Sequence, residues 1–234
     1  MASKAAIKRI LSKDIKEIQS QNLNSLGIYI EFSESNFLEA KAMIVGPKDS
    51  LYEGGFLLFN IKIPKNYPYS PPDVSYESRN RVRIHPNIYV GSHSSGKGKV
   101  CLSILGTWSG PQWTSIMDIT TVLLSLQSLL DNNPLHHEPG QENNVSCTNT
   151  LYNRVIEYES LNTLLLKNYL SIPEGFECFL ENMISEIDTN KDSILKKVEE
   201  LKENKNQEVK MNFYRINTVL NYSQLYERIT QYLN

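Results

Sequence analysis

The stretch 85–105 reads His85-Pro86-Asn87, then a polar segment over 88–99, then Val-Cys-Leu-Ser-Ile-Leu over 100–105. A turn at 106–113 follows and contains both tryptophans of the chain. Cys101, with a histidine and an asparagine nearby in sequence, is a candidate nucleophile. On composition alone, a cysteine between Val100 and Leu102 is more often a small buried hydrophobic residue. The neighbouring residues must decide between these two interpretations.

The neighbouring residues favour the interpretation of Cys101 as a nucleophile. Together, the His-Pro-Asn turn, the Cys-Leu-Ser-Ile-Leu segment, Trp108 and the helical pattern after it resemble the active-site segment of ubiquitin-conjugating enzymes. The string from Gly98 to Trp108, followed by Gly110-Pro111, is similar to the Z-type subgroup of that family. The resemblance covers residues of roughly 3 to 170. It implies an α+β ubiquitin-conjugating (UBC) fold, in which helices flank a four-stranded antiparallel meander sheet.

The resemblance also implies a reaction and its partners. Cys101 would accept ubiquitin, or a ubiquitin-like protein, as a thioester from an activating enzyme and pass it to a substrate lysine, with or without a ubiquitin ligase. Asn87 would either stabilise the oxyanion of the transfer step or order the active-site loop, and a well-placed amide donor contributes about 2.7–4 kcal/mol to such a step. No bound cofactor and no metal are implied, since ATP is used by the upstream activating enzyme.

The histidines leave their roles open. His85, beside Pro86, is expected to hold the turn by hydrogen bonds, and a general-base role for it is the less favoured alternative. His136 stands where many family members carry an acidic residue that helps to deprotonate the incoming amine. An imidazole with an ordinary pKa near 6.5 can accept that proton, so His136 is a possible proton acceptor. A histidine in a surface loop is an equally weighted interpretation.

Contacts with other proteins are expected at three places. The amphipathic pattern over 3–21 carries Lys4, Lys8 and Arg9, which are either activating-enzyme contacts or a solvated basic face. Ile63 and Pro64, beside a proline-rich loop over 64–72, are expected ligase contacts, as are Thr114 and Ser115. Family members that bind ligases often carry Phe at the position of Ile63, and many carry Ser-Pro-Ala at the positions 114–116. Because this sequence differs at both places, the class of ligase stays open. The segment 91–98 is longer than the usual family turn and is expected to be a flexible surface insertion, or a shield at the thioester.

The remaining elements follow from periodicity. Short runs rich in β-branched and aromatic residues predict strands at 27–32, 38–45, 56–63 and 73–76. Helices are expected over 3–21, from a capping box of Ser115 and Asp118 onward to residue 131, and over 144–170. The division expected is a core domain over 3–170 and a helical C-terminal extension over 171–234, with helices at 176–201 and 212–233 joined by a solvated charged stretch.

Composition excludes several classes of function. A net charge of −2 over 234 residues argues against a nucleic-acid binder, and no apolar run is long enough to predict a membrane span. The three cysteines show neither zinc spacing nor a disulfide framework, which predicts a reducing compartment, the cytoplasm or the nucleus. Two rival functions remain: a catalytically silent ubiquitin-binding module of the same fold, and a cysteine hydrolase that uses Cys101 with His85 or His136.

Overall fold

The computed structural model describes residues 4–92 and 96–233 of the chain. They form two compact units, each built from segments that are separated in the sequence. Unit 1 comprises the residues up to 44, Leu57–Ser78 and 87–130. Unit 2 comprises Val45–Phe56, Arg79–Pro86 and the residues from 131 onward. The expected division into a core over 3–170 and an extension stays a prediction.

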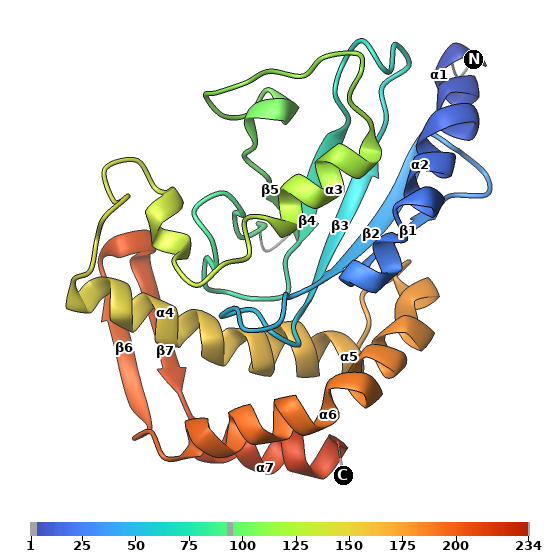
Figure 1. The fold of residues 1–234 in the computed structure, drawn as a ribbon. Coiled ribbons are helices and arrows are strands. Elements are labelled where there is room, and N and C mark those ends of the chain that lie inside the picture. Colours follow the sequence, from blue (N-terminus) through green and yellow to red (C-terminus); the bar gives the residue numbers. More distant parts are fainter. Residues whose placement is uncertain (1–3, 93–95, 234) are drawn as a thin grey trace. The chain divides into compact units, whose positions relative to one another are not determined.

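The main element of unit 1 is an antiparallel sheet of five strands, β1 to β5, which neighbour one another in sequence order (Figure 1). The four predicted strands are present, with ends within two residues of those expected. Sheet and helices together confirm the α+β fold class. The strands span β1 Ile28–Phe32, β2 Glu39–Val45, β3 Phe56–Lys62, β4 Asp73–Glu77 and β5 Lys97–Lys99.

Strand β5 shows that the end of the segment 91–98 is a regular strand and not a flexible loop, while residues 93–95 lie outside the described residues and the role of the segment stays a prediction. The end of the segment pairs with β4, as Tyr76↔Gly98 and Glu77↔Lys97. Glycine is required in this strand, because a Cβ on Gly98 would lie 1.8 Å from the carbonyl oxygen of Tyr89. The close approach of the two backbones explains why the segment forms a strand despite its glycines.

The N-terminal helix is continuous but changes its winding. It runs through α1 Lys4–Arg9, a π-helical segment η1 Ile10–Asp14 and α2 Ile15–Ser20, and a 3₁₀ turn η2 Leu23–Leu26 follows. A π turn holds more residues than an α turn and shifts the register of the apolar stripe. Ile10 is therefore buried, whereas Leu11, which the sequence places on the same stripe, is 47% exposed.

Helix α3, Ile119–Gln127, is shorter than predicted. Its N-cap is Asp118, whose carboxylate accepts from the Thr121 N–H over 2.9 Å, and not Ser115. The expected capping box at Ser115 is therefore wrong. Ile116 consequently lies before the helix and is 78% exposed instead of facing the sheet. The carboxylate of Asp118 is the stronger acceptor for the exposed N–H groups of a helix start.

A long helix in unit 2 matches the one predicted over 144–170. It consists of α4 Cys147–Glu159, a π-helical segment η5 Ser160–Lys167 and α5 Asn168–Leu170, and a 3₁₀ turn η4 Pro134–His137 precedes it. Its apolar side is fully buried at Val155, Leu161 and Leu164. Val145 lies before the helix and is 88% exposed, and Cys147 at the start of the helix is exposed as well.

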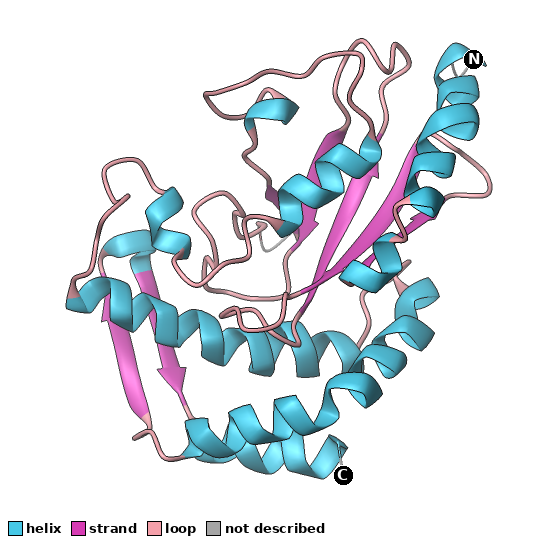
Figure 2. Ribbon diagram, in the orientation of Figure 1, coloured by secondary structure: helices cyan, strands magenta, loops and turns pink. Residues whose placement is uncertain are grey.

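The C-terminal segment contains a β-hairpin that the sequence did not predict (Figure 2). The expected helix over 212–233 is correct only in its second half. Buried and exposed residues alternate along the two strands of the hairpin. The buried residues are Val209, Met211, Ile216 and Leu220. The elements are η6 Glu177–Phe179, α6 Leu180–Lys202, β6 Gln207–Met211, η7 Phe213–Arg215, β7 Ile216–Leu220 and α7 Tyr222–Leu233.

Within the described residues, no helix combines the length and the apolar character that crossing a membrane would require.

Candidate active site

Cys101 and Asn87 are joined by two hydrogen bonds in unit 1. The N–H of Cys101 donates to the carbonyl oxygen of Asn87 over 2.8 Å. In return, Nδ2 of Asn87 donates to the carbonyl oxygen of Cys101 over 2.8 Å. Both residues are buried, and Cys101 is only 2% exposed. The structure therefore brings together the two residues that the sequence selects for chemistry, and fixes the Asn87 side chain against the cysteine backbone.

Thr107 fixes the backbone on both sides of Cys101. Its hydroxyl donates to the carbonyl oxygen of Val100 over 2.9 Å and accepts from the N–H of Leu102 over 2.9 Å. The 3₁₀ turn η3, Ser103–Leu105, and Gly106 at a φ of 69° return the chain so that Thr107 reaches these groups. Thr107 belongs to the turn at 106–113, and the sequence pattern alone indicates no role for it.

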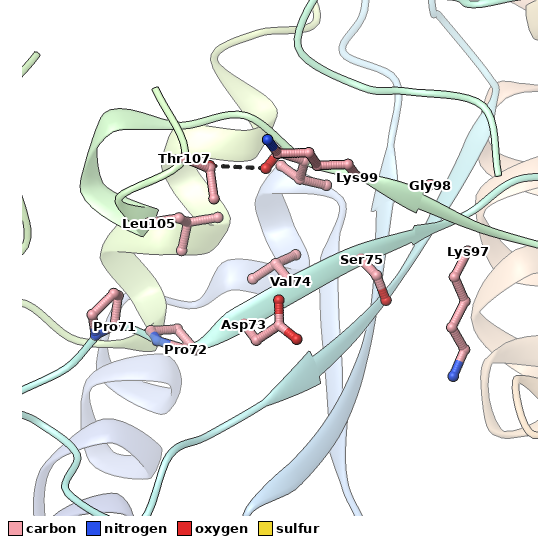
Figure 3. A pocket seen from close by; sticks show the side chains of 11 residues that line it. Pro71, Pro72, Asp73, Val74, Ser75, Lys97, Gly98, Lys99, Leu105 and Thr107 are labelled. Atoms are coloured by element: carbon pink, nitrogen blue, oxygen red, sulfur yellow. Dashed lines mark hydrogen bonds between the residues drawn. The ribbon is translucent and has the colours of Figure 1, made fainter. Parts of the chain in front are cut away.

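A groove of about 440 Å³ opens beside the Cys101 segment (Figure 3). The groove begins where the pairing of β4 with β5 ends, at Ser75↔Lys99. The carbonyl oxygen of the next residue, Val100, accepts a hydrogen bond from the Thr107 hydroxyl. Three charged residues, Asp73, Lys97 and Lys99, line the groove, and the rest of its lining is largely apolar side chains or backbone. The lining residues are Pro71, Pro72, Asp73, Val74, Ser75, Lys97, Gly98, Lys99, Val100, Leu105 and Thr107.

His85 lies in unit 2 and is fully buried, with its ring centroid 4.9 Å from that of His137. Nε2 of His137 is 2.9 Å from the carboxylate of Asp131. Burial raises the pKa of Asp131, but the hydrogen bonds from His137 and from the backbone N–H of Asn133 outweigh it, so the pKa lies below its usual value. The ring packing and burial of His85 suit a structural role in the turn.

His136 is half-buried in η4, and its Nε2 lies 3.1 Å from the carbonyl oxygen of Asn144. A carbonyl oxygen only accepts, so Nε2 must carry the hydrogen of this bond. The ring can then take up a proton only at Nδ1. Any role of His136 as a proton acceptor is therefore restricted to that nitrogen.

The basic residues of the first helix divide into two groups. Lys4 and Lys8 are exposed and line a shallow depression with Ile7 and Leu11. Arg9 instead turns inward, with Nε 3.4 Å from the carboxylate of Asp14 and Nη2 donating to the carbonyl of Met117 over 3.1 Å. The two lysines thus have accessible ammonium groups for a partner, whereas Arg9 serves the packing of unit 1.

The predicted ligase contacts differ in accessibility. Thr114 and Ser115 are exposed and Pro64 is half-buried, but Ile63 is 4% exposed and offers a partner little surface. Trp113, which precedes Thr114, donates from Nε1 to the carbonyl of Pro68 over 2.7 Å. This bond joins the proline-rich loop to the turn that follows Cys101.

Asp14 is a second residue that sequence reasoning missed. It is fully buried, and its carboxylate accepts hydrogen bonds from the Tyr67 hydroxyl and, over 3.1 Å, from the N–H of Ile119. The signal was present in the sequence, because Asp14 stands four residues from Ile10 and Ile18 on the apolar side of the helix. An acidic residue at such a position requires buried donors.

Among the described residues, no group of three or more His, Cys, Asp or Glu side chains is arranged to hold a metal ion. Cys147 and Cys178 are exposed, whereas Cys101 is buried.

The family model described as "Ubiquitin-conjugating enzyme" matches residues 10–160. Ubiquitin-conjugating enzyme E2 Z of Danio rerio is 38% identical over 192 residues, covering 79% of this chain and 56% of that protein. Ubiquitin-conjugating enzyme E2 Z of Homo sapiens is 42% identical over 139 residues, covering 58% of this chain and 37% of that protein.

A solved E2 domain of a Toxoplasma gondii ubiquitin conjugating enzyme aligns with a TM-score of 0.48 and 26% identity, covering 65% of this chain and 97% of that one. The chain spans about half the length, or less, of the curated E2 Z relatives that it matches.

Proposed function

This chain belongs to the ubiquitin-conjugating enzyme family, most like its Z type, and from that premise we propose that it carries ubiquitin, or a ubiquitin-like protein, as a thioester on Cys101. The modifier would come from an activating enzyme and pass to a lysine of a substrate protein, with or without a ligase. The observation that carries the proposal is the pair of hydrogen bonds that holds Asn87 against Cys101.

Charging is an exchange between two thioesters. The Cys101 thiolate attacks the carbonyl carbon of the modifier's C-terminal glycyl thioester on the activating enzyme. A new C–S bond forms, the old one breaks, and the sulfur of the activating enzyme leaves as a thiolate. The bonds made and broken are of the same kind, so this step requires no strong base beside Cys101. The surroundings of a cysteine that is 2% exposed must open for the thioester to form.

Discharge is the harder step. A lysine amine attacks the same carbonyl carbon, a C–N bond forms, the amine loses a proton, and the Cys101 sulfur leaves. Negative charge develops on the carbonyl oxygen in the transition state, and a fixed amide donor stabilises it. The Nδ2 group of Asn87 carries two hydrogens, so one can order the Cys101 backbone while the other serves the oxyanion. Nδ1 of His136 is a candidate acceptor for the amine proton.

No bound cofactor is part of the proposal, because the activating enzyme uses the ATP. The two lysines on the first helix, Lys4 and Lys8, are proposed contacts for that enzyme. Thr114 and Ser115, with Pro64, form the accessible part of the proposed ligase surface, to which Ile63 adds little.

A charging assay tests the carrier function. The purified chain is incubated with ATP, ubiquitin and a panel of activating enzymes, and is then run on gels with and without reductant. We expect a band heavier by one modifier that reductant removes and that Cys101→Ala abolishes. Cys101→Ser should give an oxyester band that survives reductant, because a hydroxyl accepts the acyl group but exchanges poorly with thiols.

The exposed Cys147 provides the matched control, since Cys147→Ala should charge like the unaltered chain. If no activating enzyme and no modifier in the panel gives a band, the chain is a silent binding module of the same fold. Release of free modifier from ester or amide substrates, without a stable thioester, would indicate a hydrolase.

A further inference from the structure

The turn that precedes α3 is held by cations of the N-terminal helix. Nζ of Lys13 donates to the carbonyl oxygen of Ile116 over 3.0 Å. Nη2 of Arg9 donates to the carbonyl oxygen of the next residue, Met117, over 3.1 Å. All four residues belong to unit 1. Two neighbouring carbonyl oxygens of the turn are therefore fixed by a helix that lies more than a hundred positions earlier in the sequence.

The π-helical segment η1 brings the contacting side chains together. The N–H of Ile15 donates to the carbonyl oxygen of Ile10, five positions back. In such a winding, residues five positions apart lie nearly above one another, and Nε of Arg9 is accordingly 3.4 Å from the carboxylate of Asp14. That carboxylate accepts from the N–H of Ile119 over 3.1 Å. The helix thus contacts both the turn and the start of α3.

The turn held in this way presents an apolar side chain to solvent. Ile116 is 78% exposed, and Thr114 and Ser115 beside it are exposed too. The N–H of Met117 donates to the carbonyl oxygen of Thr114 over 3.0 Å. Because the Ile116 carbonyl and the Met117 N–H belong to one planar peptide group, Lys13 and Thr114 hold the two sides of the same peptide. This restricts the direction in which the Ile116 side chain projects.

The bond from Lys13 lies at the surface, unlike the contacts of the fully buried Asp14. A hydrogen bond that is open to solvent adds little to the stability of a whole domain. It can still select one conformation of an exposed turn, since the competing conformations of a turn differ by small free energies. The contact of Lys13 with Ile116 therefore suits the control of a local surface better than the stabilisation of unit 1.

We propose that Lys13 is a positioning residue for the ligase surface: by holding the carbonyl of Ile116, it keeps the turn 114–117 in the conformation that a ligase binds. The assignment rests on the proposed function, which places ligase contacts in this turn. The partner is a ligase domain with an apolar pocket for the Ile116 side chain. Lys13 thus serves the ligase, although the same helix carries the proposed contacts for the activating enzyme.

The test compares three variants of the full chain. Lys13→Met keeps most of the aliphatic stem but removes the donor and the charge, whereas Lys13→Arg keeps both. Lys16→Met is the matched control, because it removes an exposed lysine from the same helix. Each charged protein is purified, so that effects on charging do not enter. Its discharge onto free lysine is then followed alone and with rising concentrations of isolated RING and HECT domains of ubiquitin ligases.

We expect Lys13→Met to raise the ligase concentration for half-maximal stimulation about threefold to tenfold, the factor that corresponds to one hydrogen bond of ordinary net strength. The maximal rate should not change, because a saturating ligase selects the competent turn. Discharge without ligase should not change either. Lys13→Arg should recover most of the loss, and Lys16→Met should behave like the unaltered chain.

A second measurement needs neither a modifier nor a ligase. In NMR spectra of the uncharged protein, Lys13→Met should shift the amide signal of Met117, whose peptide group contains the carbonyl that Lys13 holds. Lys16→Met should leave that signal in place. An unshifted Met117 amide in Lys13→Met would show that Lys13 does not hold the turn.

An unchanged half-maximal ligase concentration for Lys13→Met would overturn the proposal. Equal losses in Lys13→Met and Lys16→Met would overturn it as well, because they would indicate a general attraction of positive charge. A matching fall in discharge without ligase would indicate damage to the fold instead. If no ligase domain accelerates the unaltered chain, the turn is not a ligase surface and the proposal fails. If the unaltered chain never charges, the proposed function itself fails, while the Met117 signal still reports on Lys13.

Discussion

Replacing Asp14 by alanine should destabilise unit 1 more than any other single change to an acidic residue there. The carboxylate receives the Tyr67 hydroxyl, the N–H of Ile119 and the guanidinium of Arg9. Burial and the hydrogen bond to Asp14 raise the pKa of Tyr67 well above its usual value, so the phenol remains a donor. The π segment η1 places Asp14 where these three groups meet.

The magnitude follows from what the substitution leaves behind. Removing one partner of a buried ion pair costs about 3–5 kcal/mol, because the remaining donors stay buried without an acceptor. That is a large share of the 5–15 kcal/mol that stabilises a typical domain. Asp118→Ala is the matched control: its carboxylate accepts from the N–H and the hydroxyl of Thr121 at the start of α3, so we expect a loss of about 1 kcal/mol.

Urea unfolding followed by tryptophan fluorescence measures both losses. Trp108 and Trp113 lie in unit 1, so their emission reports on that unit. A loss below about 1.5 kcal/mol for Asp14→Ala, at an unchanged dependence on urea, would mean that the three donors do not depend on the Asp14 carboxylate. A double-mutant cycle of Asp14→Asn with Tyr67→Phe should show a coupling of about 1–3 kcal/mol.

Three further results are expected. His137→Phe should raise the pKa of Asp131 toward its ordinary value, as measured in a carbon-detected NMR titration. The lowered pKa stabilises the folded protein above about pH 4, and this stabilisation is lost as the pH falls, so the variant should lose part of it. An unchanged titration of Asp131 would contradict this prediction. Thr107→Val should lower stability by about 1–3 kcal/mol in urea melts and slow thioester discharge, since it frees the backbone on both sides of Cys101. In the native protein, a small thiol reagent should label the two exposed cysteines rapidly and Cys101 at least about tenfold more slowly; equal rates would show that Cys101 is accessible.

The fold could be predicted where burial follows a simple period. The four predicted strands have clear β-branched and aromatic runs, and each lies where expected. The hairpin β6–β7 was missed because β6 carries Glu208 and Lys210 on its exposed side, which is also the pattern of a solvated charged stretch. The register shift at Leu11 was also missed, because a π turn has no sequence signature.

For the site, the sequence predicted only those residues that belong to one short motif. A motif indicated Cys101 and Asn87, and the structure joins them. The contacts of Arg83 with Tyr214, and of Asp14 with Ile119, link residues more than a hundred positions apart along the chain. Periodicity and capping rules describe neighbours in sequence and cannot reveal such pairs.

Peptide mapping of the charged protein identifies the residue that carries the modifier. After charging and digestion under non-reducing, mildly acidic conditions, mass spectrometry should locate the C-terminal glycine of the modifier on the peptide that contains Cys101. We expect this peptide alone to carry the modifier. A modifier found on Cys147 or Cys178 in its place, or a chain that remains unmodified with every activating enzyme tested, would contradict it.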